Sequence, residues 1–339
     1  FRDRFNIPIS DEELSDVPFY KPPEDSEEMK YARERYEASG GFLPQRRQKA
    51  APLEMPELSI FKSLIEGSGD RAISTTMAFV RILNALVRDK TIGKLVVPIV
   101  PDEARTFGME GMFRQLGIYS SVGQLYEPVD HEELMYYRED VKGQILEEGI
   151  TEAGGMSSWV AAATAYSSHN LQMIPFYIYY SMFGFQRIGD LAWAAADMQA
   201  RGFLLGGTAG RTTLAGEGLQ HQDGHSHLLS ASIPNCISYD PTFAYELAVI
   251  IHHGMKRMFE EQENVFYYLT IMNENYEHPS MPAGVEENII KGIYLYRQSE
   301  KASVQLMGSG TILREVIAAS ELLASDFGIK SNIWSVTSF

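Results

Sequence analysis

The sequence has a single cysteine, Cys236, among its 339 residues. One thiol cannot form an intramolecular disulfide, a paired-cysteine redox motif or a cysteine-based zinc knuckle. Because Cys236 lies in the apolar segment SIPNCISYD, we expect a buried, unreactive thiol and not a nucleophile. Without a disulfide framework, a reducing cytoplasm is the expected compartment.

Basic residues and long apolar runs are also scarce. The chain has 29 Lys and Arg against 45 Asp and Glu, a net charge of −16. Such a surface repels phosphate backbones, so we do not expect nucleic acid as a partner. No run of about 18 apolar residues is present, so we expect no membrane span, and we recognise no signal peptide. The opening FRDRFN and the closing strand-like NIWSVTSF predict a fragment of a longer polypeptide.

Three regions differ in composition. Residues 1–58 are charged and rich in proline, which predicts a connector arm with one helix over 24–38. Residues 59–280 alternate helical and strand-like patterns. Residues 281–339 read strand, helix, strand in VQLMGSG, TILREVIAASELLASDFG and SNIWSVTSF, which predicts the truncated beginning of a second α/β domain. The alternation predicts an α/β fold with a mainly parallel sheet and helices on both faces.

Within the central region, several elements can be placed. STTMAFVRILNALVRDK predicts an amphipathic helix capped by Ser74 or Thr75, and the next strand carries Pro98 at its end or at a sheet edge. The other expected elements are helices over 156–167 and 190–201, strands over 173–182 and 203–206, strands in NCISYD and NVFYYLTIMNEN, and a helix from Asp240 to about 261.

Candidate site residues follow these strands. In a parallel sheet, ligands bind at the carboxyl ends of the strands. Asp102 and Glu103 follow one strand, Tyr180 and Phe183 lie at the end of another, and a glycine-rich loop and then His221 follow a third, so we expect one shared rim.

Glu152 is the candidate acid–base group. Its ordinary interpretation is a carboxylate that stabilises a helix N-terminus. Alternatively, burial among Ile150, Gly154, Gly155 and Met156 would favour its neutral form, able to exchange a proton with a ring nitrogen of a bound heterocycle. Aromatic residues near a strand end, usually core, would then stack on that ring.

The loop GLQHQDGHSH offers a further alternative. His221, Asp223, His225 and His227 have a spacing found in loop-borne metal sites, which would suit a metal hydrolase. No HExxH helix or second cysteine supports it, so we favour a histidine that orients a carboxylate substrate and moves protons. GSGT at 308–311 lacks a third glycine and predicts only a tight turn.

These segments together resemble a known family. Four blocks are similar to the decarboxylating first component, in its single-chain homodimeric form, of the bacterial pyruvate dehydrogenase complex: ILEEGITEAGG, MIPFYIYYSMFGFQRIGDLAWAAADMQARGFLLGGTAGRTTLAGEGLQHQDGHSH, PDEARTFGMEGMFRQLGIYS and NENYEHPSMP. The resemblance implies a transketolase-like fold, thiamine diphosphate and magnesium as cofactors, pyruvate as substrate, and acetyl transfer to the lipoyl group of the dihydrolipoyl acetyltransferase component. This chain resembles the pyrimidine-binding domain of that enzyme.

The resemblance also implies roles. Glu152 corresponds to the glutamate that exchanges a proton with the aminopyrimidine ring, and Phe183 to the ring that stacks on it, with Tyr180 nearby. His221 corresponds to a histidine beside the substrate. Two further pocket residues are implied near the cofactor, Asp102 and Glu103, with Arg187 as a weaker correspondence. Segment 122–138 corresponds to a loop that orders during the reaction.

One signature of the family is missing. The GDG…N motif that holds magnesium and the diphosphate is not in the sequence, so the magnesium ligands are expected outside this chain. We therefore predict that the chain alone neither binds thiamine diphosphate tightly nor turns over pyruvate. The alternatives are another thiamine-dependent dehydrogenase or transketolase, and a non-catalytic dimerisation or assembly module with the same fold.

Overall fold

The computed structural model describes residues 1–41, 46–101, 104–129, 137–209 and 218–339. The chain divides into two units, Phe1–Arg47 and Gln48–Phe339. The first contains helix α1 (Glu27–Ala38), whose N-cap Ser26 accepts a hydrogen bond from the Met29 amide. The helix was expected to begin at residue 24, and it begins three residues later, where Ser26 supplies the cap.

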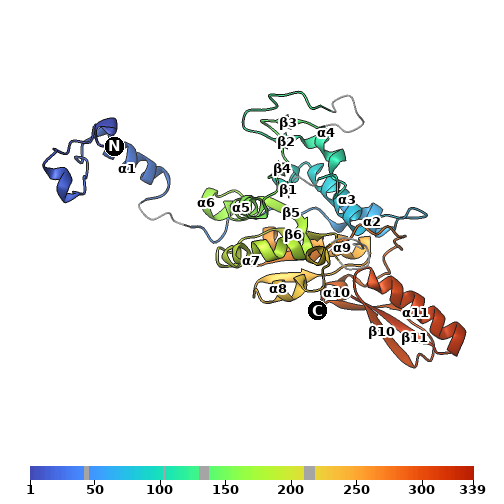
Figure 1. Cartoon of the computed structure of the whole chain (residues 1–339). Helices are drawn as coiled ribbons and strands as arrows, with labels where there is room; N and C mark the ends of the chain where they lie inside the picture. The colour runs from blue at the N-terminus through green and yellow to red at the C-terminus, as the bar shows by residue number, and fades with distance from the viewer. Residues whose placement is uncertain (42–45, 102–103, 130–136, 210–217) are drawn as a thin grey trace. The chain divides into compact units, whose positions relative to one another are not determined.

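The second unit is built on a six-stranded parallel sheet with the strand order β4-β1-β5-β6-β8-β7. Figure 1 labels β4, β1, β5 and β6 of this sheet in that order. This confirms the predicted α/β fold class. The strands are β1 (Val96–Val100), β4 (Leu146–Glu147), β5 (Ile174–Tyr180), β6 (Phe203–Gly207), β7 (Cys236–Tyr239) and β8 (Phe266–Thr270).

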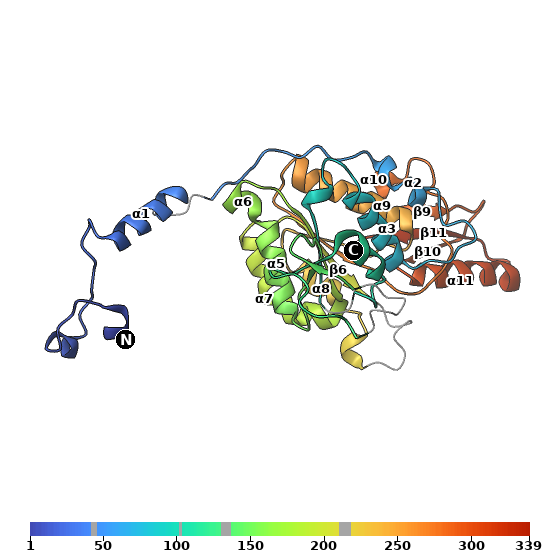
Figure 2. The same ribbon diagram turned by 90° about the horizontal axis from the view of Figure 1, so that it is seen from above.

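Helices cover both faces of this sheet, as predicted (Figure 2). Successive strand residues point to opposite faces. Phe176 and Ile178 of β5 pack in the hydrophobic cluster that contains α3 (Thr75–Val87) and α9 (Ala244–Met255). Tyr177 and Tyr179 pack in the other cluster, with α5 (Glu152–Ala163) and α7 (Ser181–Asp197). Both faces are therefore buried, which explains the continuous apolar strands.

Pro98 lies inside a strand, and the prediction that it marks an end or an edge was wrong. β1 is the second strand of the sheet and pairs with β5 from Val96 to Ile99. On its other side, β4 is so short that it pairs only with Ile99 and Val100. Pro98 is tolerated there because that pairing begins only after it.

Three helices begin elsewhere than the sequence indicated. α5 begins at Glu152 and not at residue 156, and α7 begins at Ser181 and not at residue 190. α9 begins at Ala244, because Glu246 accepts hydrogen bonds from the Thr242 and Phe243 amides. Asp240, the expected cap of that helix, instead accepts hydrogen bonds from two hydroxyls, Thr270 (2.6 Å) and Ser309 (2.8 Å).

The C-terminal segment has its own small sheet with the order β10-β11-β9. The predicted strand–helix–strand is present as β10 (Val304–Gly308), α11 (Ile312–Phe327) and β11 (Ser331–Val336). The sequence did not indicate β9 (Ile293–Arg297), which pairs antiparallel to β11, or α10 (Glu286–Ile290).

The smaller elements complete the described chain. Residues 120–140 were expected as a long loop, but they end in β3 (Glu139–Asp140), which pairs in parallel with β2 (Ile118–Tyr119) to form a two-stranded sheet. No helix in the described ranges is long and apolar enough to cross a bilayer. The other α-helices are α2 (Lys62–Ile65), α4 (Phe113–Leu116), α6 (Ala165–His169) and α8 (Ser226–Ala231).

Candidate functional site

The candidate site lies where β4 and β5 end at the carboxyl edge of the parallel sheet. β5 ends at Tyr180, and α7 begins at the next residue. β4 ends at Glu147, and α5 begins five residues later at Glu152. Because parallel strands end on the same side, the first turns of α5 and α7 lie at one edge.

Phe183 was expected at the end of a strand, but it lies in the first turn of α7. Its half-buried ring stacks on the His221 imidazole with a centroid distance of 4.8 Å and an interplanar angle of 13°. The Tyr180 ring meets the same imidazole edge-on at 5.3 Å. His221 ends the short 3₁₀ helix Leu219–His221 and thus reaches the site from a distant part of the chain.

Arg187 joins this aromatic group to the acid. It lies one helical turn after Phe183, where side chains four residues apart meet. Its guanidinium carbon is 3.4 Å from the centroid of the Phe183 ring, and Nη1 donates to the Phe183 carbonyl at 2.8 Å. Its Nε is 3.9 Å from Oε2 of Glu152. The structure therefore brings together Glu152, Tyr180, Phe183, Arg187 and His221.

Glu152 is the first residue of α5, and its side chain is 18% exposed. Thr151 caps the helix by accepting a hydrogen bond from the Gly154 amide (3.1 Å). The expected apolar surroundings are only partly present, since Gly155 and Met156 are buried while Ile150 is 84% exposed. Its place in the first turn of α5 fits the ordinary interpretation, a carboxylate that stabilises a helix N-terminus, and the acid–base role stays a prediction.

The histidine loop does not gather its titratable side chains around one point. Asp223 accepts hydrogen bonds from the His225 amide (3.1 Å) and from the amide and hydroxyl of Ser226 at the start of α8. His227 Nε2 lies 2.9 Å from the Thr270 hydroxyl. Among the described residues, no group of three or more His, Cys, Asp or Glu is arranged to hold a metal ion.

Two predicted pocket residues, Asp102 and Glu103, lie outside the described residues, as does part of segment 122–138. Cys236 is buried in β7, and burial raises the pKa of its thiol to about 12. This confirms the expectation of an unreactive thiol.

Sequence reasoning missed two residues that support the site. The buried Tyr177 hydroxyl donates to the Glu152 carbonyl at 3.2 Å, and its ring would lie 2.7 Å from a Cβ at Gly155. Burial raises the pKa of Tyr177, and nearby carboxylates add to the shift, so its hydroxyl remains a donor. Phe107 packs against Tyr180 at 5.5 Å. The Gly154-Gly155 pair was the available signal, because adjacent glycines allow close packing.

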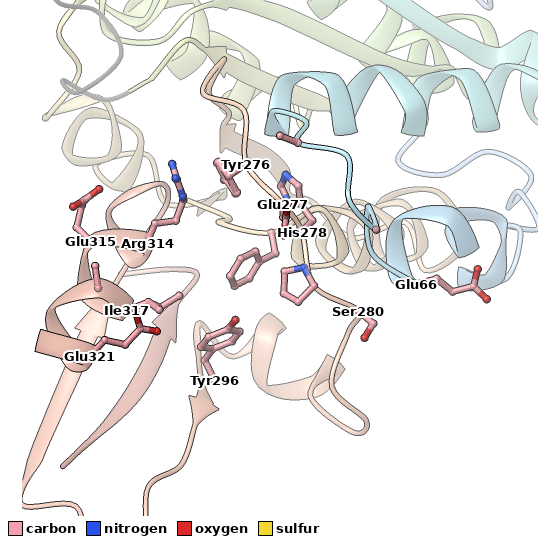
Figure 3. Close-up of a pocket in the computed structure, with 15 residues that line it drawn as sticks. Glu66, Tyr276, Glu277, His278, Ser280, Tyr296, Arg314, Glu315, Ile317 and Glu321 are labelled. Carbon is pink, nitrogen blue, oxygen red and sulfur yellow. The ribbon is translucent and has the colours of Figure 1, made fainter. Parts of the chain in front are cut away.

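A cavity lies elsewhere in the second unit. It has a volume of about 840 Å³ and lies between α11, β9 and the segment after β8 (Figure 3). Its lining includes Glu277, His278, Tyr296, Arg314 and Glu321, and none of the predicted site residues. Arg314 is ion-paired with Glu274, and His278 is buried with both ring nitrogens in hydrogen bonds. We therefore place the candidate site at the sheet edge and not in this cavity.

Comparison with known proteins identifies the family. A family model described as the pyruvate dehydrogenase E1 component middle domain matches residues 53–279. The chain belongs to the pyruvate dehydrogenase E1 component family. A model of the transketolase-like C-terminal domain matches residues 292–339.

Several proteins named pyruvate dehydrogenase E1 component match this chain along its whole length. The chain is 67% identical to the protein of that name from Pseudomonas aeruginosa over 342 residues, which cover 100% of the chain and 39% of the relative. It is 59% identical to that of Escherichia coli K12, covering 38% of the relative. The chain thus spans about two fifths of the length of these relatives.

Solved structures show the same fold at low identity. A transketolase from Campylobacter jejuni superposes with a TM-score of 0.62 at 18% identity, covering 82% of this chain and 38% of that one. Transketolase from Leishmania mexicana gives 0.65 at 16%, covering 84% and 37%. The transketolase-like fold that the resemblance implied is thereby confirmed. Membership of this family implies a thiamine diphosphate cofactor.

Proposed function

We propose that this chain supplies the pyrimidine-binding half of a thiamine diphosphate site in an enzyme that decarboxylates pyruvate oxidatively. The acetyl group would pass to the lipoyl group of the dihydrolipoyl acetyltransferase component. The observation that supports this most directly is the contact chain from Glu152 through Arg187 and Phe183 to His221. It places an acid, an aromatic ring and a titratable imidazole at one sheet edge in a member of the family.

The residues present fit the aminopyrimidine part of the cofactor. A flat heterocycle with a basic ring nitrogen needs an aromatic face and a carboxyl within reach of that nitrogen. The half-buried Phe183 ring offers the face, and the carboxyl of Glu152 lies close enough to share one guanidinium with it. When bound, thiamine diphosphate supplies the electron sink that stabilises the carbanion left by loss of carbon dioxide.

Each residue has a separate task in this proposal. Glu152 holds and moves a proton at its carboxylate oxygens, which Tyr177 positions through the Glu152 backbone. Phe183 orients the heterocycle and excludes water from one side of it. His221 is held by two aromatic rings, and imidazole is the side chain best suited to proton transfer near neutral pH. We assign it to the reacting end of pyruvate.

The rest of the site is proposed to come from outside this chain. The sequence has no GDG…N motif, so we assign the magnesium ligands and diphosphate contacts to another part of the full-length enzyme. The expected homodimer would bring that part from a second copy. The non-catalytic alternative, the acetyltransferase partner and the cytoplasmic location remain predictions.

The test is pyruvate-dependent reduction of an artificial electron acceptor by the full-length enzyme with thiamine diphosphate and magnesium. Substituting Glu152→Gln keeps the size of the side chain and removes the acid. The expected loss in kcat is about 10²- to 10⁴-fold, the usual contribution of a positioned acid–base group. Glu148→Gln is the matched control, since Glu148 is a half-buried glutamate in the same segment.

Equal activity of the Glu152→Gln enzyme and the wild type would contradict the role of Glu152. Turnover of pyruvate by the isolated chain, without any added protein, would contradict the proposal that half of the site lies elsewhere. A wild-type enzyme that binds no thiamine diphosphate would contradict the proposed function as a whole.

A further inference from the structure

The guanidinium of Arg187 lies between the two groups that the heterocycle needs. Its carbon is 3.4 Å from the Phe183 ring centroid, which places it directly over one face of the ring. Its Nε is 3.9 Å from Glu152 Oε2. Guanidinium is flat and carries N–H donors along its edge, like a protonated aminopyrimidine. Arg187 therefore makes both contacts that the ring of the cofactor would make.

The two faces of Phe183 are covered by different side chains. The His221 imidazole is nearly parallel to the ring at 4.8 Å, too close to lie beside it in the same plane, so it covers a face. A guanidinium 3.4 Å from the centroid leaves no room for an imidazole on its own side. Arg187 and His221 thus cover opposite faces, and a third ring can stack only by displacing one of them.

Contact with the acid decides which of the two is displaced. The heterocycle must reach the Phe183 face and the Glu152 carboxylate together. Arg187 is the side chain that spans these two groups, whereas His221 contacts the rings of Phe183 and Tyr180. We infer that Arg187 is an intramolecular competitor of the aminopyrimidine, and that cofactor binding requires its guanidinium to leave Phe183 and Glu152. This inference rests on the proposed function.

Arg187 can leave at little cost to the fold. Its side chain is 44% exposed, so the guanidinium has access to solvent. Its Nη1 donates a hydrogen bond to the Phe183 carbonyl, which lies inside α7 and already accepts a helical hydrogen bond. The contact with Glu152, at 3.9 Å, is weak and screened by water. Arg187 is thus held by a ring contact, one hydrogen bond to the Phe183 carbonyl and one weak ion pair.

The experiment is calorimetric titration of the full-length enzyme with thiamine diphosphate and magnesium. Arg187→Met keeps the length of the side chain but removes its planar cation. The dissociation constant should fall roughly three- to thirtyfold, which corresponds to loss of one exposed cation–π contact and one exposed ion pair. Simple electrostatics predicts the opposite, a higher dissociation constant, because the variant loses a positive charge near an anionic cofactor.

Arg297→Met is the matched control. Arg297 is 43% exposed, pairs with Glu321 at 3.3 Å and lies 6.0 Å from the Tyr296 ring, yet it is far along the chain in β9. Its loss should leave the dissociation constant unchanged. Arg187→Lys, which keeps the charge without the planar group, should bind the cofactor more tightly than the wild type but less tightly than Arg187→Met.

A crystal structure of the full-length enzyme with thiamine diphosphate gives a second, activity-independent result. We expect the heterocycle on the Phe183 face that Arg187 covers here. Unchanged or weaker binding by Arg187→Met, or a guanidinium still over Phe183 beside the bound ring, would overturn the inference alone. Wild-type enzyme that fails to bind thiamine diphosphate would overturn the proposed function, and the inference with it.

Discussion

Two tyrosines of β5 show that a buried hydroxyl group can either stabilise or destabilise the fold. Tyr177 and Tyr179 point to the same face and are both fully buried. The Tyr177 hydroxyl donates to the Glu152 carbonyl at 3.2 Å. The Tyr179 hydroxyl has no hydrogen-bond partner among the described residues. A buried hydroxyl without a partner costs free energy, whereas a satisfied one contributes to stability.

Removing these hydroxyl groups should therefore have different effects. Tyr177→Phe should lower the free energy of unfolding by about 0.5–1.5 kcal/mol and also reduce kcat, because the start of α5 loses its anchor. Tyr179→Phe should leave the stability unchanged or raise it. Urea unfolding followed by tryptophan fluorescence measures the free energy of unfolding of the two variants. Equal losses in the two variants would show that the hydrogen bond to Glu152 does not matter.

At the level of elements, the start of α7 decides the geometry of the site. The sequence pattern extended β5 to residue 182, because aromatic residues favour strands. The helix instead begins at Ser181, and this change places Phe183 and Arg187 one turn apart on one helical face. The approximate positions of Glu152 and Tyr180 were predictable from the strand ends. The approach of His221, 38 residues from Phe183, depends on tertiary packing that no local pattern contains.

Glycines on α7 offer an internal comparison. A Cβ at Gly184 would lie 2.3 Å from the Tyr179 ring, whereas a Cβ at Gly189 would meet nothing within 4 Å. Gly184→Ala should lower the free energy of unfolding by about 1–3 kcal/mol through overpacking. Gly189→Ala should raise it by about 1 kcal/mol, the difference in helix propensity. Thermal unfolding of the two variants checks the position of the helix, and the reverse order would contradict it.

At the level of the whole molecule, a buried carboxylate joins the C-terminal segment to α9, a helix that packs against the main sheet. Glu246 of α9 is fully buried and accepts hydrogen bonds from the hydroxyls of Tyr294 (2.6 Å) and Ser335 (2.7 Å) in β9 and β11. It also accepts two amide hydrogen bonds at the start of its own helix. The parallel sheet and its two helical layers were predictable from the sequence. This junction was not, since its partners lie 48 and 89 residues away.

Glu246→Gln should weaken this junction. An amide turns one acceptor into a donor that faces other donors, and we expect a loss of about 2–4 kcal/mol in unfolding free energy. Limited proteolysis between β8 and β9 should also become faster. Glu287→Gln, which removes an exposed ion pair with Lys291, is the control and should unfold like the wild type. Similar behaviour of the two variants would argue against the junction.

Stability should also depend on pH through three buried or half-buried histidines. Two of them lie in α9, and the third lines the cavity beside α11. Burial lowers the pKa of His252, His253 and His278, so the unfolded chain binds their protons more readily. Stability is then fully present above the unfolded pKa of about 6.5 and is lost as the pH falls below it. Burial of Glu246 raises its pKa and acts in the opposite direction.

The unfolding temperature should therefore fall between about pH 7 and pH 5. His278→Gln, whose amide can replace both ring hydrogen bonds, should reduce this slope by up to one proton, or about 1.4 kcal/mol per pH unit. Scanning calorimetry across this range measures it. An unchanged slope would mean that His278 is not held neutral in the folded protein.

The central claim, that Phe183 and its neighbours form the pyrimidine side of a thiamine diphosphate site, is tested most directly by calorimetric binding of the cofactor to the full-length Phe183→Leu enzyme with magnesium. Loss of the stacking ring should raise the dissociation constant about 5- to 160-fold, equivalent to about 1–3 kcal/mol. Phe327→Leu, at an exposed position of α11, should bind like the wild type. A Phe183→Leu enzyme with wild-type affinity would contradict the account.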